Sequence, residues 1–233
     1  MEKGKTAVSD EPRKPAPKAL RPRLAASLIL TRGSRQTTEV LMGRRSARHV
    51  FMPNKYVFPG GRVDRADLTA PLAKDLPSDI LTVMSRVMPE RRARAAAIAA
   101  VRETAEETGL LIAREAVIRS RHGNWAPFRA SGVAPDLSGL RLITRAVTPP
   151  GRSRRFDTWF FTADASALCD GRPPEPSSEL EDVQWVPLDR ARTLDLPMVT
   201  HFVLDELGRV LPPSPQPTRW IRDVRGKMAI ETL

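Results

Sequence analysis

The chain has 233 residues, and its 38 lysines and arginines outnumber its 27 aspartates and glutamates to give a formal net charge of +11. Hydrophobic residues make up 41% of it, enough for one domain with a buried core, but no apolar run reaches the roughly 18 residues needed to cross a membrane. The single cysteine, Cys169, excludes an internal disulfide and, with an N-terminus lacking an apolar segment, indicates a cytoplasmic protein.

The positive charge favours anionic partners, either nucleic acid or a phosphate-rich metabolite. Aromatic residues make up only 5% of the chain, which argues against a surface that stacks the bases of single-stranded nucleic acid. A small-molecule substrate is therefore the expected partner.

The chain divides into three stretches by composition. Residues 1–22 place lysines and arginines among prolines, cannot bury enough apolar surface to fold, and are predicted to be a disordered basic arm. Residues 23–211 contain no repeat and no linker and are predicted to form one domain. Residues 212–233 are predicted to be a C-terminal tail, with Trp220 and Ile221 as candidate anchors.

The first part of the domain is predicted to consist of short strands and turns. Its apolar runs predict strands at 24–31, 39–43 and 56–58, the first two joined as a hairpin by a turn at 33–36. After Pro59, the pair Gly60-Gly61 is predicted to form a turn, because adjacent glycines permit positive φ angles and close approach of the backbone to a ligand.

An acidic helix is predicted from Pro89 to about Thr108, and its end reads Arg102-Glu103-Thr104-Ala105-Glu106-Glu107-Thr108-Gly109-Leu110. Its three glutamates fall at i, i+3 and i+4 and share one face, where like charges repel. A divalent cation would relieve this repulsion, because Mg²⁺ prefers carboxylate oxygens. The alternative is a solvated acidic face closed by a glycine C-cap.

The second half of the domain is predicted to alternate strands and helices. Strands are expected at 140–147, 155–163 and 183–186, and helices at 188–192 and 196–211.

The acidic stretch resembles the second half of the Nudix box, G-x5-E-x7-R-E-U-x-E-E-x-G-U, where U is aliphatic and where this chain has Thr104 at the first U. Gly61 would be the first glycine, but Arg102 follows it by 41 positions instead of 14, so 27 residues are extra. Position 67, where the box glutamate would fall, is Asp67, and that role is assigned to no residue here. The insert, about 65–92, contains a predicted helix at 79–87 that either recognises substrate or decorates the surface.

The resemblance implies an α/β fold, the Nudix α/β/α sandwich around a mixed β-sheet, and metal-dependent hydrolysis of a diphosphate. Mg²⁺ or Mn²⁺ would be held by the Gly61 carbonyl and by Glu103, Glu106 and Glu107. In the catalytic set, Arg102 would pin a carboxylate and Glu103 would orient or deprotonate water. A distal acid, Glu179 or alternatively Glu181, would complete it.

Two further stretches resemble one branch of the family. Arg45-Ser46 before Phe58-Pro59-Gly60-Gly61 resembles part of the coenzyme A signature. The split box, followed by residues 148–151 and 154–158, resembles the peroxisomal acyl-coenzyme A diphosphatases and their bacterial relatives. This branch implies cleavage of coenzyme A or acyl-coenzyme A to 3′,5′-ADP and 4′-phosphopantetheine. The candidate substrate-binding residues are Arg44, Arg45, Arg154 and Arg155.

The alternatives are a diphosphatase of ADP-ribose, NADH or nucleoside triphosphates, and a catalytically idle binder of a nucleotide or RNA. The sequence predicts no membrane partner and leaves a homodimer open.

Overall fold

The computed structural model describes residues 20–34, 36–48, 52–211, 217–224 and 227–233. Most of the predicted basic arm, residues 1–19, lies outside the described residues, as does Arg35 of the predicted turn.

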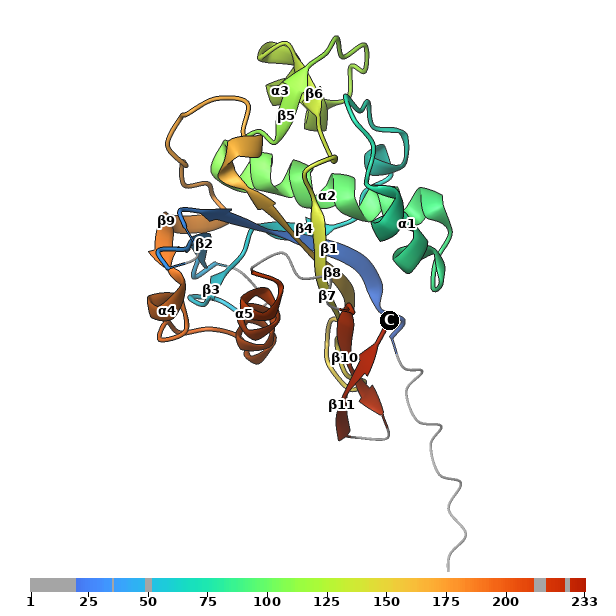
Figure 1. Cartoon of the computed structure of the whole chain (residues 1–233), viewed down its shortest axis with the longest axis vertical. Coiled ribbons are helices and arrows are strands. Elements are labelled where there is room, and N and C mark those ends of the chain that lie inside the picture. Colours follow the sequence, from blue (N-terminus) through green and yellow to red (C-terminus); the bar gives the residue numbers. More distant parts are fainter. Residues whose placement is uncertain (1–19, 35, 49–51, 212–216, 225–226) are drawn as a thin grey trace, which may run out of the picture.

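A mixed nine-stranded sheet forms the centre of the fold (Figure 1). Its strands are β1 (Arg23–Arg32), β2 (Glu39–Arg45), β3 (Tyr56–Val57), β4 (Gly60–Arg62), β7 (Arg141–Val147), β8 (Phe156–Asp164), β9 (Leu180–Pro187), β10 (Arg219–Val224) and β11 (Lys227–Thr232). The main path runs β11-β10-β7-β8-β1-β2-β3, while β4 pairs with β1 and β9 pairs with β2. The pairs β1–β8 and β7–β10 are parallel and the others antiparallel, so the predicted mixed sheet is confirmed.

Helices cover both faces of this sheet, and the predicted α/β/α sandwich is confirmed. Figure 1 shows α1 (Ser78–Ser85) and α2 (Glu90–Thr108) on one side, and α4 (Leu188–Ala191) and α5 (Met198–Val210) on the other. Each layer buries its own apolar cluster, the larger one under α2 and the smaller one under α5. The long helix α2 therefore lies where one of its faces is fixed by the sheet.

The local sequence explains where α2 begins and ends. Pro89, predicted as the first helical position, is instead its N-cap, so the helix begins one residue later at Glu90. Six alanines within Ala93–Ala100 let the helix lie close to the sheet. Gly109 ends it with φ +71°, and its N–H donates to the Ala105 carbonyl at 3.0 Å. The acidic sequence is thus the last two turns of a rigid, buried helix.

Several elements were not predicted from the sequence. A small second sheet pairs β5 (Ala113–Glu115) with β6 (Val133–Pro135), and α3 (Ala126–Ala130) lies beside it. Three short 3-10 helices also occur, η1 (Ala66–Thr69), η2 (Gly123–Trp125) and η3 (Ala165–Ala167). The predicted tail contains β10 and β11, which extend the main sheet beyond β7, and Ile221 packs against the smaller apolar cluster.

The predicted helix of the insert exists as α1. Its buried residues Ile80, Leu81 and Met84 join the larger apolar cluster and pack it against α2. In the described part of the chain, no helix combines the length and hydropathy that a membrane crossing requires.

Candidate active site

The candidate site forms where strand β4 runs against the last turns of α2. The sequence predicted a glycine turn here, but Gly60 and Gly61 are paired residues of β4, opposite Ser27 and Ala26 of β1. Neither of them has a positive φ. These glycines are required by close packing, because a Cβ on Gly61 would lie 2.3 Å from Glu103 Oε1 and one on Gly60 only 2.2 Å from Ser27 Oγ.

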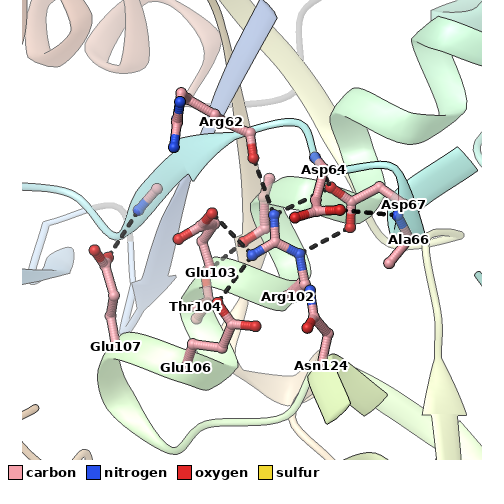
Figure 2. Close-up of polar contacts among 12 residues, drawn as sticks. Arg62, Asp64, Ala66, Asp67, Arg102, Glu103, Thr104, Glu106, Glu107 and Asn124 are labelled. Carbon is pink, nitrogen blue, oxygen red and sulfur yellow. Dashed lines mark hydrogen bonds and ion pairs between the residues drawn. The ribbon is translucent and has the colours of Figure 1, made fainter. Parts of the chain in front are cut away.

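Arg102 is the centre of the polar network (Figure 2). Its Nε–H donates to Asp67 Oδ1 at 2.8 Å, and Nη2 donates to Asp67 Oδ2 at 3.1 Å and to the Arg62 carbonyl at 3.0 Å. Nη1 donates to Glu103 Oε1 at 2.8 Å and to Glu106 Oε2 at 2.9 Å. All five N–H groups of the guanidinium are therefore engaged, and two of the three helix glutamates are held by one cation.

Asp67 is the site residue that sequence reasoning missed. Its side chain is fully buried and makes a bidentate pair with Arg102. The signal was the spacing, since Asp67 lies six positions after Gly61, as G-x5-E requires. The first half of the box is thus intact apart from a shorter acid, and the 27 extra residues fall between Asp67 and Arg102.

Thr104 replaces the usual aliphatic residue without leaving a polar atom unsatisfied. Its side chain is fully buried, and its hydroxyl donates to the Ala100 carbonyl one turn earlier at 2.8 Å.

Glu107 is separate from the Arg102 network. Its side chain turns toward β4, where Glu107 Oε2 accepts a hydrogen bond from the Gly60 N–H at 2.9 Å, and the residue is only 3% exposed (Figure 2). The helix glutamates therefore sit at two depths, with Glu106 the most accessible.

Burial governs the protonation of these acids. It raises the pKa of Glu107 to about 8, more than the Gly60 N–H lowers it, and raises the pKa of Glu103 to about 7 despite the neighbouring Arg102. The pKa of Glu106 is raised by burial as well. Burial lowers the pKa of Arg102, but its bonds to Asp67 and the charges around it raise it on balance, so Arg102 remains a cation.

An open cleft of about 1540 Å³ lies over this network. The predicted site residues that line it are Gly61, Arg102, Glu103, Glu106, Glu179, Arg45, Arg154 and Arg155. Glu107 is beneath its floor and does not appear in the lining. The cleft thus brings together residues from five separate parts of the sequence.

Arg44 is the predicted substrate-binding residue that the structure does not bring to the cleft. It follows the alternation of β2, so it points away from the face that Arg45 occupies, and its Nη2 pairs with Glu181 Oε2 at 3.0 Å. The same pair removes Glu181, the alternative distal acid, from the cleft. Glu179 lines the cleft, and its charge contributes to the raised pKa values of the three helix glutamates.

Among the described residues, no three histidine, cysteine or acidic side chains already converge as a metal site. The reason is visible in Figure 2, since Glu103 and Glu106 turn to Arg102 while Glu107 turns to Gly60. The donors nevertheless suit a hard divalent cation, because the carboxylates of Glu103 and Glu107 are packed against the Gly60-Gly61 backbone, where a Cβ on Gly61 would collide with Glu103, and Glu106 is on the same helix. A bound cation would also offset the cost of ionising the buried Glu103 and Glu107.

Comparison with known proteins identifies the family. Residues 88–203 match the NUDIX domain, a match that begins after Asp67 and most of the insert. The crystal structure of a NUDIX hydrolase from Alicyclobacillus acidocaldarius is 30% identical with a TM-score of 0.62, covering 79% of this chain and 90% of that chain. This chain belongs to the Nudix hydrolase family.

Two curated relatives have names that specify more than the family. The acyl-coenzyme A diphosphatase NUDT19 of Gallus gallus is 27% identical over 202 residues, covering 62% of this chain and 52% of that protein. The putative nudix hydrolase 7 of Caenorhabditis elegans is 29% identical over 178 residues, covering 70% of this chain and 51% of that protein. This chain therefore spans about half the length of both relatives. Nudix hydrolases generally use divalent metal ions.

Proposed function

We propose that this protein hydrolyses the diphosphate of coenzyme A or its thioesters, releasing 3′,5′-ADP and 4′-phosphopantetheine or its acyl form. The observation that carries the proposal is that one cleft is lined by Glu103, Glu106 and Glu179, by many arginines and by apolar side chains. The similarity to an acyl-coenzyme A diphosphatase supports the same assignment.

The acids would hold the metal and position water. Glu103, Glu106, Glu107 and the Gly61 carbonyl are the proposed ligands, with Mg²⁺ or Mn²⁺ as the ion. When bound, the ion supplies charge neutralisation for the diphosphate oxygens. Arg102 fixes the directions of Glu103 and Glu106 through its bonds to both. Burial keeps the pKa of Glu103 near the operating range of a general base, and Glu179 is the proposed distal acid that orients the attacking water.

The cleft also offers an apolar surface for a pantetheine or acyl arm. Val57 and Val199 are half-buried and line it, together with Phe58, Phe160 and Pro197, whose exposed surface is small. A nucleotide without such an arm would leave this surface uncovered. The apolar lining therefore favours coenzyme A over ADP-ribose, NADH or a nucleoside triphosphate.

Of the four arginines predicted from the sequence to bind substrate, Arg45 and Arg154 are the proposed phosphate contacts. Arg154 is exposed in the cleft, whereas the guanidinium of Arg155 bridges the carbonyls of Thr148 and Leu20 at 3.0 and 2.6 Å. Arg155 therefore contributes positive potential and fixes the loop, while Arg154 is available for direct contact.

A substrate panel tests the proposal. The purified protein with Mg²⁺ or Mn²⁺ is incubated with coenzyme A, acyl-coenzyme A, ADP-ribose, NADH and nucleoside triphosphates, and products are identified by mass spectrometry. We expect 3′,5′-ADP from the coenzyme A substrates at the highest kcat/KM. Turnover confined to ADP-ribose or NADH would remove the coenzyme A assignment, and binding without turnover of any substrate would favour an idle binder.

A further inference from the structure

A wall of arginines lines the cleft beside the candidate catalytic acids. Arg62 and Arg65 come from β4 and the residues after it, and Arg91 and Arg92 come from the first turn of α2. The insert begins near Arg65 and ends near Arg92, so its two ends deliver cations to one surface. None of these four residues was among the substrate-binding residues predicted from the sequence.

These arginines have no carboxylate partner within the described part of the chain. All four are exposed, and none forms an ion pair with another described residue. Arginines elsewhere are commonly paired, for example Arg145 with Asp157 and Arg94 with Asp75. The nearby Asp64 also lines the cleft, but its carboxylate accepts a bond from the Ala66 N–H. The wall is therefore a concentration of unneutralised cations inside a concave site.

The spacing along α2 fixes how far this wall lies from the acids. Arg92 precedes Glu103 by eleven residues, which is close to three full turns, so both side chains project from the same face of the helix. At 1.5 Å per residue the two positions are roughly 16 Å apart. The two phosphates of one nucleotide lie closer together than this, so the long arginine side chains have to extend toward the acids to reach the second phosphate, a group that inorganic diphosphate lacks.

Arg62 lies beside the candidate catalytic acids. Its carbonyl accepts a hydrogen bond from Arg102, while its side chain points away from Arg102 and the residue lines the cleft (Figure 2). A substrate whose diphosphate lies over Glu103 and Glu106 can therefore place a second phosphate among these four arginines, which line the same cleft. Guanidinium groups suit this role because their planar donors match phosphate oxygens in pairs.

We propose that Arg62, Arg65, Arg91 and Arg92 bind a phosphomonoester of the substrate, remote from the diphosphate that is cleaved. The proposal rests on the proposed function and deepens it: in coenzyme A the group is the ribose 3′-phosphate. A ribose 2′-phosphate has the same chemistry, so the ligands in the test must separate the two. The insert thereby supplies substrate specificity through its ends, while α1 in its middle is a packing element.

Binding to ligands that cannot be cleaved tests the wall without relying on turnover. Calorimetry compares AMP, adenosine 3′,5′-bisphosphate and adenosine 2′,5′-bisphosphate on the wild-type protein and on the double variants Arg91→Gln/Arg92→Gln and Arg62→Gln/Arg65→Gln. We expect the wild type to bind a bisphosphate roughly tenfold or more tightly than AMP, as one or more charge-assisted hydrogen bonds would provide. Both double variants should lose most of this preference while binding AMP almost normally.

A matched control removes the same charge elsewhere. Arg190 on α4 and Lys227 on β11 are exposed, form no ion pair with a described residue and do not line the cleft. The variant Arg190→Gln/Lys227→Gln should therefore keep the preference, and thermal denaturation of all three variants establishes that they are folded. Equal wild-type affinity for AMP and both bisphosphates, or an unchanged preference in the wall variants, would overturn the proposal. A preference for the 2′,5′ isomer would support a phosphomonoester site at these arginines and identify its ligand as a 2′-phosphate.

Kinetics with coenzyme A and dephospho-coenzyme A, which lacks the 3′-phosphate, separate this inference from the proposed function. If both are cleaved with equal kcat/KM, the proposed phosphomonoester site is wrong and the coenzyme A assignment stands. If neither is cleaved but the bisphosphate preference holds, the coenzyme A assignment is wrong and the phosphomonoester site stands. If coenzyme A is preferred, the wall variants should reduce its kcat/KM and leave that of dephospho-coenzyme A nearly unchanged.

Discussion

Arg102 determines the geometry of the acidic cluster at the scale of single residues. It is buried between Asp67 and the α2 glutamates and satisfies four acceptor groups at once. The carboxylates of Glu103 and Glu106 would otherwise be free to rotate over the cleft. Asp67 therefore contributes to the site without lining the cleft, because it fixes the arginine that fixes the acids.

Replacing Asp67 by Asn should destabilise the fold by roughly 3–5 kcal/mol, the range for removing the charge of one partner of a buried ion pair. The physical reason is that Asp67 and Arg102 have side chains only 0% and 4% exposed, so water cannot replace the lost charge. Urea denaturation measures the difference in the free energy of unfolding. Asp64→Asn is the control, since Asp64 is exposed and an amide oxygen can still accept from the Ala66 N–H. Equal stability of the two variants would contradict this account.

The sequence predicted the glutamates and Arg102 because their spacing along one helix is a local pattern. It did not assign Asp67 as the partner of Arg102, because the pair closes over 34 intervening residues and its spacing from Gly61 was the only signal. It also could not separate Glu179 from Glu181, or Arg44 from Arg45. Those choices depend on which face of β2 and β9 each side chain occupies after a register shift between Met42 and Arg44.

At the scale of elements, the C-terminal hairpin of β10 and β11 shows that local sequence patterns do not predict strand pairing between distant parts of the chain. The strands at the start of the domain and β7 to β9 are predicted closely, because each is an apolar run bounded by turn residues. In contrast, β10 and β11 are rich in charged residues, and β10 joins the sheet by parallel pairing with β7, about 75 residues earlier. Only the three-dimensional structure reveals this pairing. The β5–β6 sheet was missed for a similar reason, since its strands are three residues long.

Glu206 anchors that hairpin to α5, and replacing it by Gln should weaken the attachment. The residue is 1% exposed and accepts hydrogen bonds from Arg209 Nη1 at 2.7 Å and Arg219 Nε at 3.0 Å. Because both arginines are partly exposed and can be solvated, we expect a loss on the order of 1–3 kcal/mol. Hydrogen exchange should then show faster exchange of the β10 amides than of the β1 amides. Uniform acceleration throughout the sheet would contradict a local anchoring role.

At the scale of the whole molecule, the buried acids link stability to pH and to metal binding. The pKa values of Glu103 and Glu107 in the folded protein are about 7 and about 8, above their ordinary value of 4.5. The folded state therefore keeps protons that the unfolded chain has already lost above pH 4.5. The stabilisation that comes from these protons is complete below pH 4.5 and is lost as the pH rises through 7 to 8.

We therefore expect the Tm of the metal-free protein to fall between about pH 5 and pH 8. The increase in Tm produced by Mg²⁺ or Mn²⁺ should grow over the same interval, because the ion binds the ionised carboxylates. Differential scanning fluorimetry in EDTA and in excess metal measures both trends.

The variant Glu107→Gln provides a specific check on this link. At pH 7 the amide resembles the protonated acid that the metal-free protein already contains, so stability without metal should change little. Its metal-induced increase in Tm and its metal-dependent hydrolysis should both be lost. Normal turnover in this variant would remove Glu107 from the proposed metal ligands.

The position of the insert has a consequence for how this fold tolerates length changes. The Asp67–Arg102 pair closes the loop that contains the extra residues, so the network of the candidate site does not depend on the length of the segment between η1 and α2. Lengthening a flexible loop from 7 to 34 residues costs only about 1.4 kcal/mol in closure entropy. The burial of Ile80, Leu81 and Met84 against α2 is sufficient to offset that cost. The segment between η1 and α2 is therefore a natural site for grafting a foreign segment without disturbing the acidic cluster.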